Sequence, residues 1–260
     1  MSAVETVEDP NDPRLADYRH MKDRDLSAEG GRFVAESELV VRRLLESGLE
    51  VLSVLATPLR LSTLGDALAN ATYPIYSATQ AVLDAITGFH VHRGCLAIGQ
   101  RPRDTALPAA ARTLLVLEDL VSADNIGAAA RNAAAFGVDA IVVSPRTADP
   151  FYRKAIRVSI GAVFQLPVIR LADWPAGLLL LKQQGFVLLG AVVDDRATPL
   201  GAVRRPEKVA LLLGAEGPGL SAVARAACDA LITIPMAPGA DSLNVATAGA
   251  VALFHLQQVR

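Results

Sequence analysis

The chain has 260 residues, 52% of them hydrophobic and 20% charged, and its mean hydropathy is +0.34. At about 150 residues per domain this length favours two domains, the composition excludes a disordered or collagen-like chain, and no apolar run approaches the ~18 residues of a membrane span. The formal net charge of −2 excludes a surface that is basic throughout, so binding of nucleic acid would depend on local clusters of Lys and Arg.

The pattern of the first hundred residues predicts a small α/β domain behind a short polar lead. Residues 1–13 are acidic and contain Pro, which predicts a flexible segment. They lack the basic and then apolar regions of a signal peptide, so we expect a cytoplasmic protein. The domain over 14–100 is expected to contain, in chain order, a helix over 36–47, strands over 51–55 and 74–77, a helix over 79–86 and a strand over 95–98.

This half of the chain also holds cations and possible metal ligands. Phosphate groups could be bound by the cations near the start, which are Arg14, Arg19, Lys22, Arg24 and Arg32. His90 and His92 have the spacing of a metal pair, but without a third ligand nearby a surface contact or plain exposure is favoured. Cys95 and Cys228 stand outside any C-x-x-C pair, so we expect neither a disulfide framework nor a metal site.

The second half predicts a parallel sheet. Residues 101–112 lose their periodicity and contain two Pro, which is typical of an interdomain linker. The domain over 113–260 then shows continuous apolar runs at 114–118, 140–144, 163–168, 186–193, 208–214 and 230–236. Such runs indicate strands buried on both faces. Because open α/β sheets bind ligands at the carboxyl ends of their strands, the loops after Glu118, Gly214 and Met236 are candidate site loops.

The first of these loops leads into the segment D-N-I-G-A-A-A-R-N-A-A-A-F-G over 124–137. It predicts a helix with Asn125 as N-cap and Gly137 behind its end, and Arg131 would lie inside it. By itself the pattern is typical of an ordinary helix with one surface arginine. The many alanines, however, would let another element approach and leave one long cation projecting from a surface of small residues.

The second loop follows the strand over 208–214. Gly214, Gly217 and Gly219 are spaced G-x-x-G-x-G before a helix that begins at Ser221. The loop matches neither the dinucleotide fingerprint nor the lysine-containing phosphate loop. Glu216 would repel a pyrophosphate, so a cofactor without phosphates fits better. A tight turn would account for the glycines but would leave Glu216 unexplained.

The third loop follows the strand over 230–236, where a Pro- and Gly-containing stretch ends in Ser242-Leu243-Asn244 and a helix. Ser242 is expected to be the N-cap, a structural role that would be sufficient to explain it. Asn244 in the first turn is less ordinary, because its amide can donate to or accept from a ligand at the mouth of the helix.

Together and in this order, the three motifs resemble the SpoU, or TrmH-like, branch of the SPOUT RNA 2′-O-ribose methyltransferases. The matching blocks lie at 125–137, 211–221 and 234–254, and the resemblance covers about the last 150 residues. It implies a C-terminal α/β domain with a parallel sheet and a trefoil knot that binds S-adenosyl-L-methionine and forms a homodimer. Residues 14–100 are in turn similar to a small α/β RNA-binding domain that resembles certain ribosomal proteins.

The resemblance also implies roles for single residues. The cofactor would be held by Leu213, Gly214, Gly219, Ile234, Met236 and Leu243. The catalytic set would be Arg131, Asn125, Glu216, Ser242 and Asn244. Independently of the resemblance, the local clusters of cations make Arg24, Arg153, Lys154 and Arg157 candidate RNA contacts together with Arg131. The physical chemistry agrees, since an apolar cleft beside a carboxylate suits a sulfonium cation better than a phosphate cradle would.

The expected reaction is methyl transfer from S-adenosylmethionine to a ribose 2′-hydroxyl in rRNA or tRNA. Arginine is a poor base, so Arg131 is expected to grip a neighbouring phosphate and to stabilise the developing alkoxide. One rival is a non-catalytic RNA-binding protein that keeps the fold, which the joint presence of Arg131, Glu216, Ser242 and Asn244 disfavours. A nucleotide-dependent oxidoreductase is disfavoured by the absent G-x-G-x-x-G.

Overall fold

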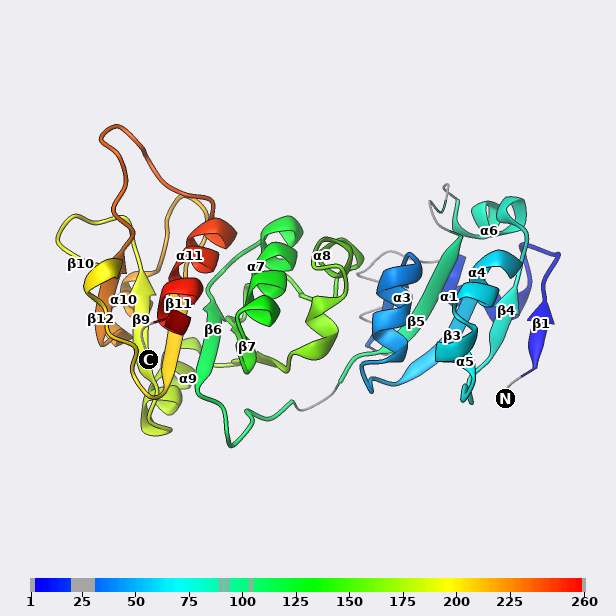
Figure 1. The fold of residues 1–260 in the computed structure, drawn as a ribbon, viewed down its shortest axis with the longest axis horizontal. Coiled ribbons are helices and arrows are strands. Elements are labelled where there is room, and N and C mark those ends of the chain that lie inside the picture. Colours follow the sequence, from blue (N-terminus) through cyan, green and yellow to red (C-terminus); the bar gives the residue numbers. More distant parts are fainter. Residues whose placement is uncertain (1–2, 20–30, 89–90, 92–93, 103–104, 259–260) are drawn as a thin grey trace. The chain divides into compact units, whose positions relative to one another are not determined.

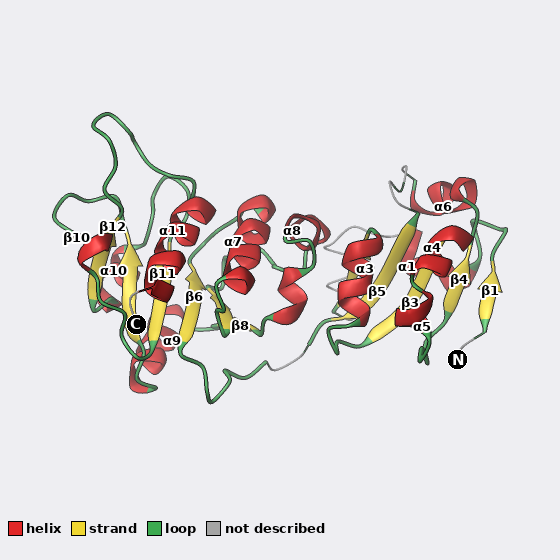
Figure 2. Cartoon of the chain, in the orientation of Figure 1, coloured by secondary structure: helices red, strands yellow, loops and turns green. Residues whose placement is uncertain are grey.

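The structure of the chain, a computed structural model, describes residues 3–19, 31–88, 91, 94–102 and 105–258. The chain forms two compact units. The first consists of Met1–Arg103 together with Phe151–Phe164, and the second of Asp104–Pro150 together with Gln165–Arg260. Each unit contains both strands and helices, as Figure 1 and Figure 2 show.

The first unit is built on a five-stranded sheet in the order β1-β4-β3-β5-β2. β5 runs antiparallel to both β3 and β2, and the remaining pairs are parallel. The strands are β1 (Val4–Thr6), β2 (Arg32–Glu36), β3 (Val51–Ala56), β4 (Ile75–Ser77) and β5 (Cys95–Gln100). The helices before α8 are η1 (Pro13–Leu15), α1 (Ala16–Arg19), α3 (Glu38–Leu45), α4 (Pro58–Thr63), α5 (Gly65–Leu68) and α6 (Gln80–Thr87).

Both edge strands of this sheet differ from the sequence prediction. β1 lies within residues 1–13, where a flexible lead is predicted, and pairs in parallel with β4. Its three residues are exposed, so no alternation of apolar and polar residues marks the strand. β2 is also missed, because its buried apolar stretch of three residues is flanked by Arg32 and Glu36 and is too short to stand out.

Phe151–Phe164 belongs to the first unit, whereas the sequence predicts it as part of a continuous domain over 113–260. The segment carries α8 (Arg153–Val158) and the 3-10 turn η2 (Ala162–Gln165). The rings of Phe151 and Phe164 lie 5.1 and 5.3 Å from the ring of Phe33 in β2. The strand predicted over 163–168 is therefore wrong: Phe164 joins this aromatic cluster, and the next strand begins at Val168.

The second unit contains a seven-stranded parallel sheet in the order β10-β12-β9-β11-β6-β7-β8. Its strands are β6 (Thr113–Leu117), β7 (Ala140–Val143), β8 (Val168–Arg170), β9 (Val187–Ala191), β10 (Thr198–Pro199), β11 (Val209–Leu213) and β12 (Ala230–Thr233). Its helices are α7 (Ala123–Ala135), α9 (Trp174–Gln183), η3 (Leu200–Ala202), α10 (Ala222–Ala227) and α11 (Val245–Gln258). The predicted α/β fold with a parallel sheet is thus confirmed.

Helices pack on the two faces of this sheet. On one face, Leu114 and Val116 of β6 join a hydrophobic cluster with Leu178 of α9 and Ala224 of α10. On the other, α11 lies so close to β11 that a Cβ on Gly249 would stand 2.7 Å from the side chain of Leu213. None of the helices within the described ranges combines the length and hydropathy needed to cross a bilayer.

Candidate active site

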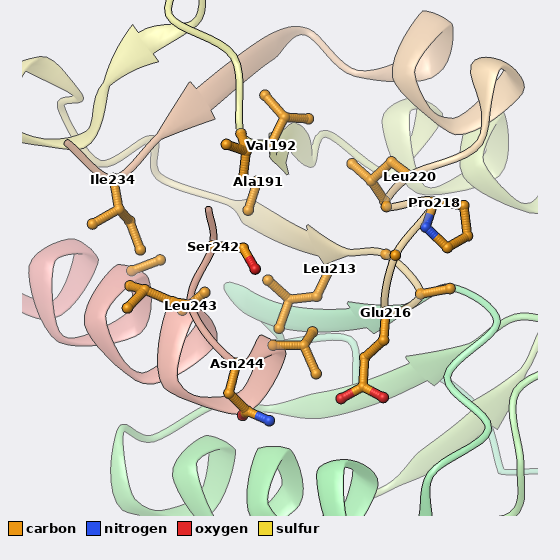
Figure 3. A pocket seen from close by; sticks show the side chains of 18 of the residues that line it. Ala191, Val192, Leu213, Glu216, Pro218, Leu220, Ile234, Ser242, Leu243 and Asn244 are labelled. Carbon is orange, nitrogen blue, oxygen red and sulfur yellow. The ribbon is translucent and has the colours of Figure 1, made fainter. Parts of the chain in front are cut away.

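A cavity of about 550 Å³ opens at the carboxyl ends of β9, β11 and β12 (Figure 3). Its walls are mostly apolar and include two of the three predicted site loops, those after Gly214 and Met236, but not the loop after β6. Every residue predicted to hold a cofactor lines it, namely Leu213, Gly214, Gly219, Ile234, Met236 and Leu243. Glu216, Ser242 and Asn244 of the predicted catalytic set line it as well.

The glycine loop, residues 214–220, folds back on itself beside the cavity. The Gly219 N–H donates to the Ala215 carbonyl at 2.9 Å, which closes the turn. Gly214 faces the returning backbone, and a Cβ there would overlap the carbonyl carbon of Gly219 and the nitrogen of Leu220. Gly217 and Gly219 have φ of 84° and 70°, values that residues other than glycine rarely adopt. The loop geometry therefore needs these glycines, and it presents Glu216 at its tip.

Three polar side chains from three elements form a hydrogen-bonded chain. The Asn125 side-chain amide donates through Nδ2 to the Glu216 carboxylate, and the Asn125 Oδ1 accepts from Asn244 Nδ2 at 2.8 Å. The Asn244 Oδ1 in turn accepts from the backbone N–H of Ala246 at 2.9 Å. Figure 3 shows Glu216 and Asn244 both reaching toward α7, which carries Asn125. The buried Asn125 thus fixes the orientation of the carboxylate at the cavity mouth.

Two predicted N-caps are wrong. α7 begins at Ala123 behind Ser122, whose Oγ accepts from the Asn125 N–H at 3.4 Å, so Asn125 lies in the first turn with its amide free for the polar chain. α11 begins at Val245, and its first N–H groups are satisfied by Asn244 and not by Ser242. The Ser242 hydroxyl has no hydrogen-bond partner among the described residues and faces the cavity.

The turn before α7 is fixed by Asp119, which has a left-handed φ of 55°. Its carboxylate accepts from Ser144 Oγ at 2.7 Å and from the Arg146 guanidinium, and its N–H donates to Ser144 Oγ at 2.9 Å. The hydrogen bond from Arg146 lowers the pKa of Asp119 below its ordinary value. These contacts hold the chain between β6 and the buried Asn125 in one conformation.

Arg131 lies apart from this set. It is exposed on α7, is not among the described residues that line the cavity, and forms no hydrogen bond or ion pair with any of them. The predicted RNA contacts on α8 belong to the first unit, where Arg153 and Arg157 lie 3.9 and 3.7 Å from the Glu36 carboxylate. Lys154 is exposed on the same helix.

Other sequence predictions fall on residues that are not described. Arg24, His90 and His92 lie outside the described residues. Within the described part of the chain, no group of three or more His, Cys, Asp or Glu side chains is arranged to hold a metal ion. Burial raises the pKa of the Cys95 thiol to about 12 and that of Cys228 to about 11, which makes both poor nucleophiles.

The sequence reasoning missed one wall of the cavity. Ala191, Val192 and Val193 line it from the end of β9. Arg225 of α10 also lines it and donates a hydrogen bond to Asp194 at 3.3 Å. The apolar run at 186–193 was a signal for this wall, because the carboxyl ends of parallel strands meet at one edge of the sheet. Its position beside β11 depends on the strand order, which the sequence pattern does not reveal.

Comparison with known proteins agrees with the fold and the motifs. Residues 112–254 match the SpoU rRNA Methylase family. A Mycobacterium tuberculosis protein described as an uncharacterized tRNA/rRNA methyltransferase, Rv0881, is 44% identical, with 97% of this chain and 91% of that protein covered. The 23S rRNA (guanosine(2553)-2′-O)-methyltransferase RlmP of Bacillus subtilis is 27% identical, with 98% and 100% covered.

Solved structures are similar over nearly the whole chain. An rRNA methyltransferase from Sinorhizobium meliloti superposes with a TM-score of 0.85 at 23% identity, covering 99% of this chain and 98% of that one, which shows a shared fold. The chain therefore belongs to the SpoU rRNA methylase family, and the resemblance stated from its three motifs is confirmed.

Proposed function

We propose that this protein transfers a methyl group from S-adenosylmethionine to the ribose 2′-hydroxyl of a guanosine in 23S rRNA. The observation that carries the proposal is the cavity at the strand ends, with the Glu216–Asn125–Asn244 chain at its mouth. Relatives support the substrate: RlmP acts on a guanosine of 23S rRNA, and so does the Escherichia coli methyltransferase RlmB, 31% identical over 77% of this chain.

The cavity fits the cofactor. A volume of about 550 Å³ and largely apolar walls are typical of sites for molecules of this size. Gly214 and Gly219 expose backbone to the cavity, and Glu216 adds a carboxylate that suits a sulfonium and opposes a pyrophosphate. Leu213, Ile234, Met236 and Leu243 would hold its apolar parts. When bound, S-adenosylmethionine supplies an electrophilic methyl group.

The residues of this chain align the nucleophile. The Ser242 hydroxyl and the Glu216 carboxylate face the cavity mouth, where they can bind a ribose hydroxyl. Glu216, oriented by Asn125, is the group we assign to accept the proton of the ribose hydroxyl. The methyl group would come from the bound sulfonium, whose S–CH3 bond would break to leave a neutral thioether. The cationic Arg131 binds the adjacent phosphate and stabilises the developing alkoxide.

This role for Arg131 favours a homodimer. Because the exposed Arg131 does not line the described cavity of its own chain, we infer that it serves the cavity of a second subunit. The apolar surface of α11 supports an interface there, since Val251 and Phe254 are 39% and 54% exposed. Phe254 also contacts Phe136 at the end of α7, the helix that carries Arg131.

The finer features of the fold are part of the same proposal. We infer that the second unit contains the trefoil knot, which is supported by β11 lying between β9 and β6 and by α11 packing on both β11 and α7. The first unit contains residues 14–100, for which the RNA-binding likeness to certain ribosomal proteins is expected. It would recruit the RNA through Arg24 and the cations of α8. The cytoplasm, where ribosomal RNA is found, is the location this function requires.

The test is transfer of a labelled methyl group into total RNA separated into ribosomal and transfer fractions. We expect label in rRNA at a guanosine ribose, lost by about 100-fold in Arg131→Ala and nearly as much in Arg131→Lys, because a point charge does not replace the guanidinium fork. Cofactor affinity should stay within about twofold of wild type in both variants. Arg112→Ala removes an exposed cation at the amino end of β6, whereas the cavity lies at the carboxyl ends of the strands, so this variant should keep full activity.

Three outcomes would contradict the proposal. Label in tRNA would overturn the substrate, and loss of cofactor binding in Arg131→Lys would overturn the role of that residue. Absence of label in any RNA, with cofactor and RNA binding intact, would favour the non-catalytic RNA-binding protein.

A further inference from the structure

Glu118, which directly follows β6, is a buried carboxylate that the proposed chemistry does not use. It is 2% exposed and does not line the described cavity. Its Oε1 accepts from the indole Nε1 of Trp174 at 2.6 Å and from Ser221 Oγ at 2.5 Å, and its Oε2 accepts from the Ser221 N–H at 2.9 Å. A carboxylate held away from water needs donors of this kind.

These contacts place Glu118 at both ends of the glycine loop. At the start of the loop, the Glu118 N–H donates to the carbonyl of Leu213 at 2.9 Å. At its end, the Glu118 carboxylate binds the N–H and the hydroxyl of Ser221, which also caps α10 by accepting from Ala224 at 3.2 Å. Glu118, directly after β6, therefore fixes the separation of the two loop ends, and with it the cavity wall that carries Gly214, Glu216 and Gly219.

The hydrogen bond from Trp174 connects Glu118 to a fluorescent side chain. Trp174, at the start of α9, is the single tryptophan of the chain. Its indole N–H shares the Oε1 of Glu118 with the Ser221 hydroxyl. A shift of Ser221 therefore changes the electrostatic surroundings of the indole.

We propose that Glu118 is a positioning residue for the cofactor cavity: its hydrogen bonds to both ends of the glycine loop hold the loop in its binding conformation, and Trp174 reports that conformation. The inference rests on the proposed function, because it takes the cavity as the cofactor site. It concerns cofactor affinity and not the chemical step, since Glu118 touches none of the residues assigned to the ribose.

Glu118→Gln tests the proposal with little change in size. The amide has one acceptor oxygen and an NH₂ group that would face the donors of Trp174 or Ser221, so buried donors lose their partner. We expect the Kd for S-adenosylhomocysteine, measured by calorimetry, to rise about 10- to 100-fold. The KM for S-adenosylmethionine should rise in parallel, while kcat at saturating cofactor stays within about twofold of wild type.

A matched control separates positioning from general destabilisation. Asp139 also accepts two backbone N–H groups next to β6, from Arg112 at 2.7 Å and Thr113 at 2.8 Å, but at the opposite edge of the sheet. Asp139→Asn should lower the Tm without changing cofactor affinity. Ser221→Ala should weaken cofactor binding, and Ser221→Thr, which keeps the hydroxyl, should restore it.

Tryptophan emission gives a readout without RNA. Adding S-adenosylhomocysteine to the wild-type chain should change Trp174 emission, and Glu118→Gln at saturating ligand should lose that change. An unaltered Kd in Glu118→Gln, or equal losses of affinity in Glu118→Gln and Asp139→Asn, would overturn the inference. A wild-type chain that binds cofactor but methylates no RNA would refute the proposed function and leave this inference standing, whereas one that binds no cofactor would refute both.

Discussion

Glu118 and Asp119 are adjacent carboxylates that form hydrogen bonds with different parts of the second unit. Glu118 bonds to Ser221 on the glycine-loop side, while Asp119 bonds to Ser144 and Arg146 at the end of β7. The backbone of Asp119 has a left-handed φ of 55°. Asp tolerates this conformation better than most residues with a side chain. The two residues therefore stand between the glycine loop, which Glu118 binds, and α7, which carries Asn125.

The pKa of Asp119 makes this turn sensitive to acid. Because Arg146 lowers the folded-state pKa below the unfolded value near ~3.9, the ionised carboxylate stabilises the fold above that pH and loses its contribution as the pH falls through the folded pKa. Asp119→Asn should therefore lower the free energy of unfolding by about 1 kcal/mol at pH 7. Urea unfolding between pH 3 and 8 should show the gap between wild type and variant closing below about pH 4. A gap at pH 3 as large as at pH 7 would refute this account.

Single residues also show how far sequence reasoning reaches. Asn125 and Asn244 could be selected as polar residues at helix starts, but the hydrogen bond between them joins positions 119 residues apart. Nothing local to either motif specifies that contact. The N-caps of α7 and α11 differ from the prediction for a related reason. Several Ser, Asn and Asp residues near each helix start are equally good caps, and the path of the loop decides between them.

At the scale of elements, the glycine loop depends on the close approach of Gly214 to the backbone of Gly219 and Leu220. A Cβ on Gly214 would overlap backbone atoms of Gly219 and Leu220, which cannot rotate away as a side chain can. Gly214→Ala should therefore cost at least about 2 kcal/mol of stability and weaken cofactor binding, measured by thermal unfolding and calorimetry. If Gly214→Ala kept both its Tm and its cofactor affinity, the close approach at Gly214 would not be needed for stability or binding.

Gly201→Ala is the matched control for this substitution. Gly201 has open space where a Cβ would lie, and its φ is not in the left-handed region. The added methyl group should change stability by less than about 1 kcal/mol, in the stabilising direction, because it restricts the unfolded chain. Cofactor affinity should be unchanged.

Strands with long apolar runs were predictable, and the short edge strands of the first unit were not. The continuous apolar runs that became β6, β7, β9, β11 and β12 are long enough to be recognised without an alignment. β1 and β2 are short edge strands with polar or exposed residues. The apolar pattern also predicts Phe164 in a strand, although its ring packs on Phe33. A hydrophobic pattern indicates which residues are buried, but it does not indicate which other element they pack against.

At the scale of the whole molecule, the proposed dimer accounts for an exposed apolar residue. Phe254 on α11 is 54% exposed and lies 6.2 Å from the ring of Phe136. Phe254→Asp should convert a dimer into a monomer in light scattering after size exclusion and should abolish methyl transfer. Leu180 of α9 is 55% exposed on another helix, so Leu180→Asp should remain dimeric and active. A wild-type monomer with full activity would refute the dimer.

Mixed dimers test whether the site is shared. If Arg131 serves the cavity of the other subunit, Arg131→Ala and Asn244→Ala chains are each inactive as homodimers for different reasons. A mixed dimer has one cavity in which an intact Asn244 from the first chain meets an intact Arg131 from the second. Mixing the two variants under conditions that exchange subunits should therefore restore methyl transfer. If both groups acted within a single chain, each chain of the mixed dimer would carry a defect and the mixture would stay inactive.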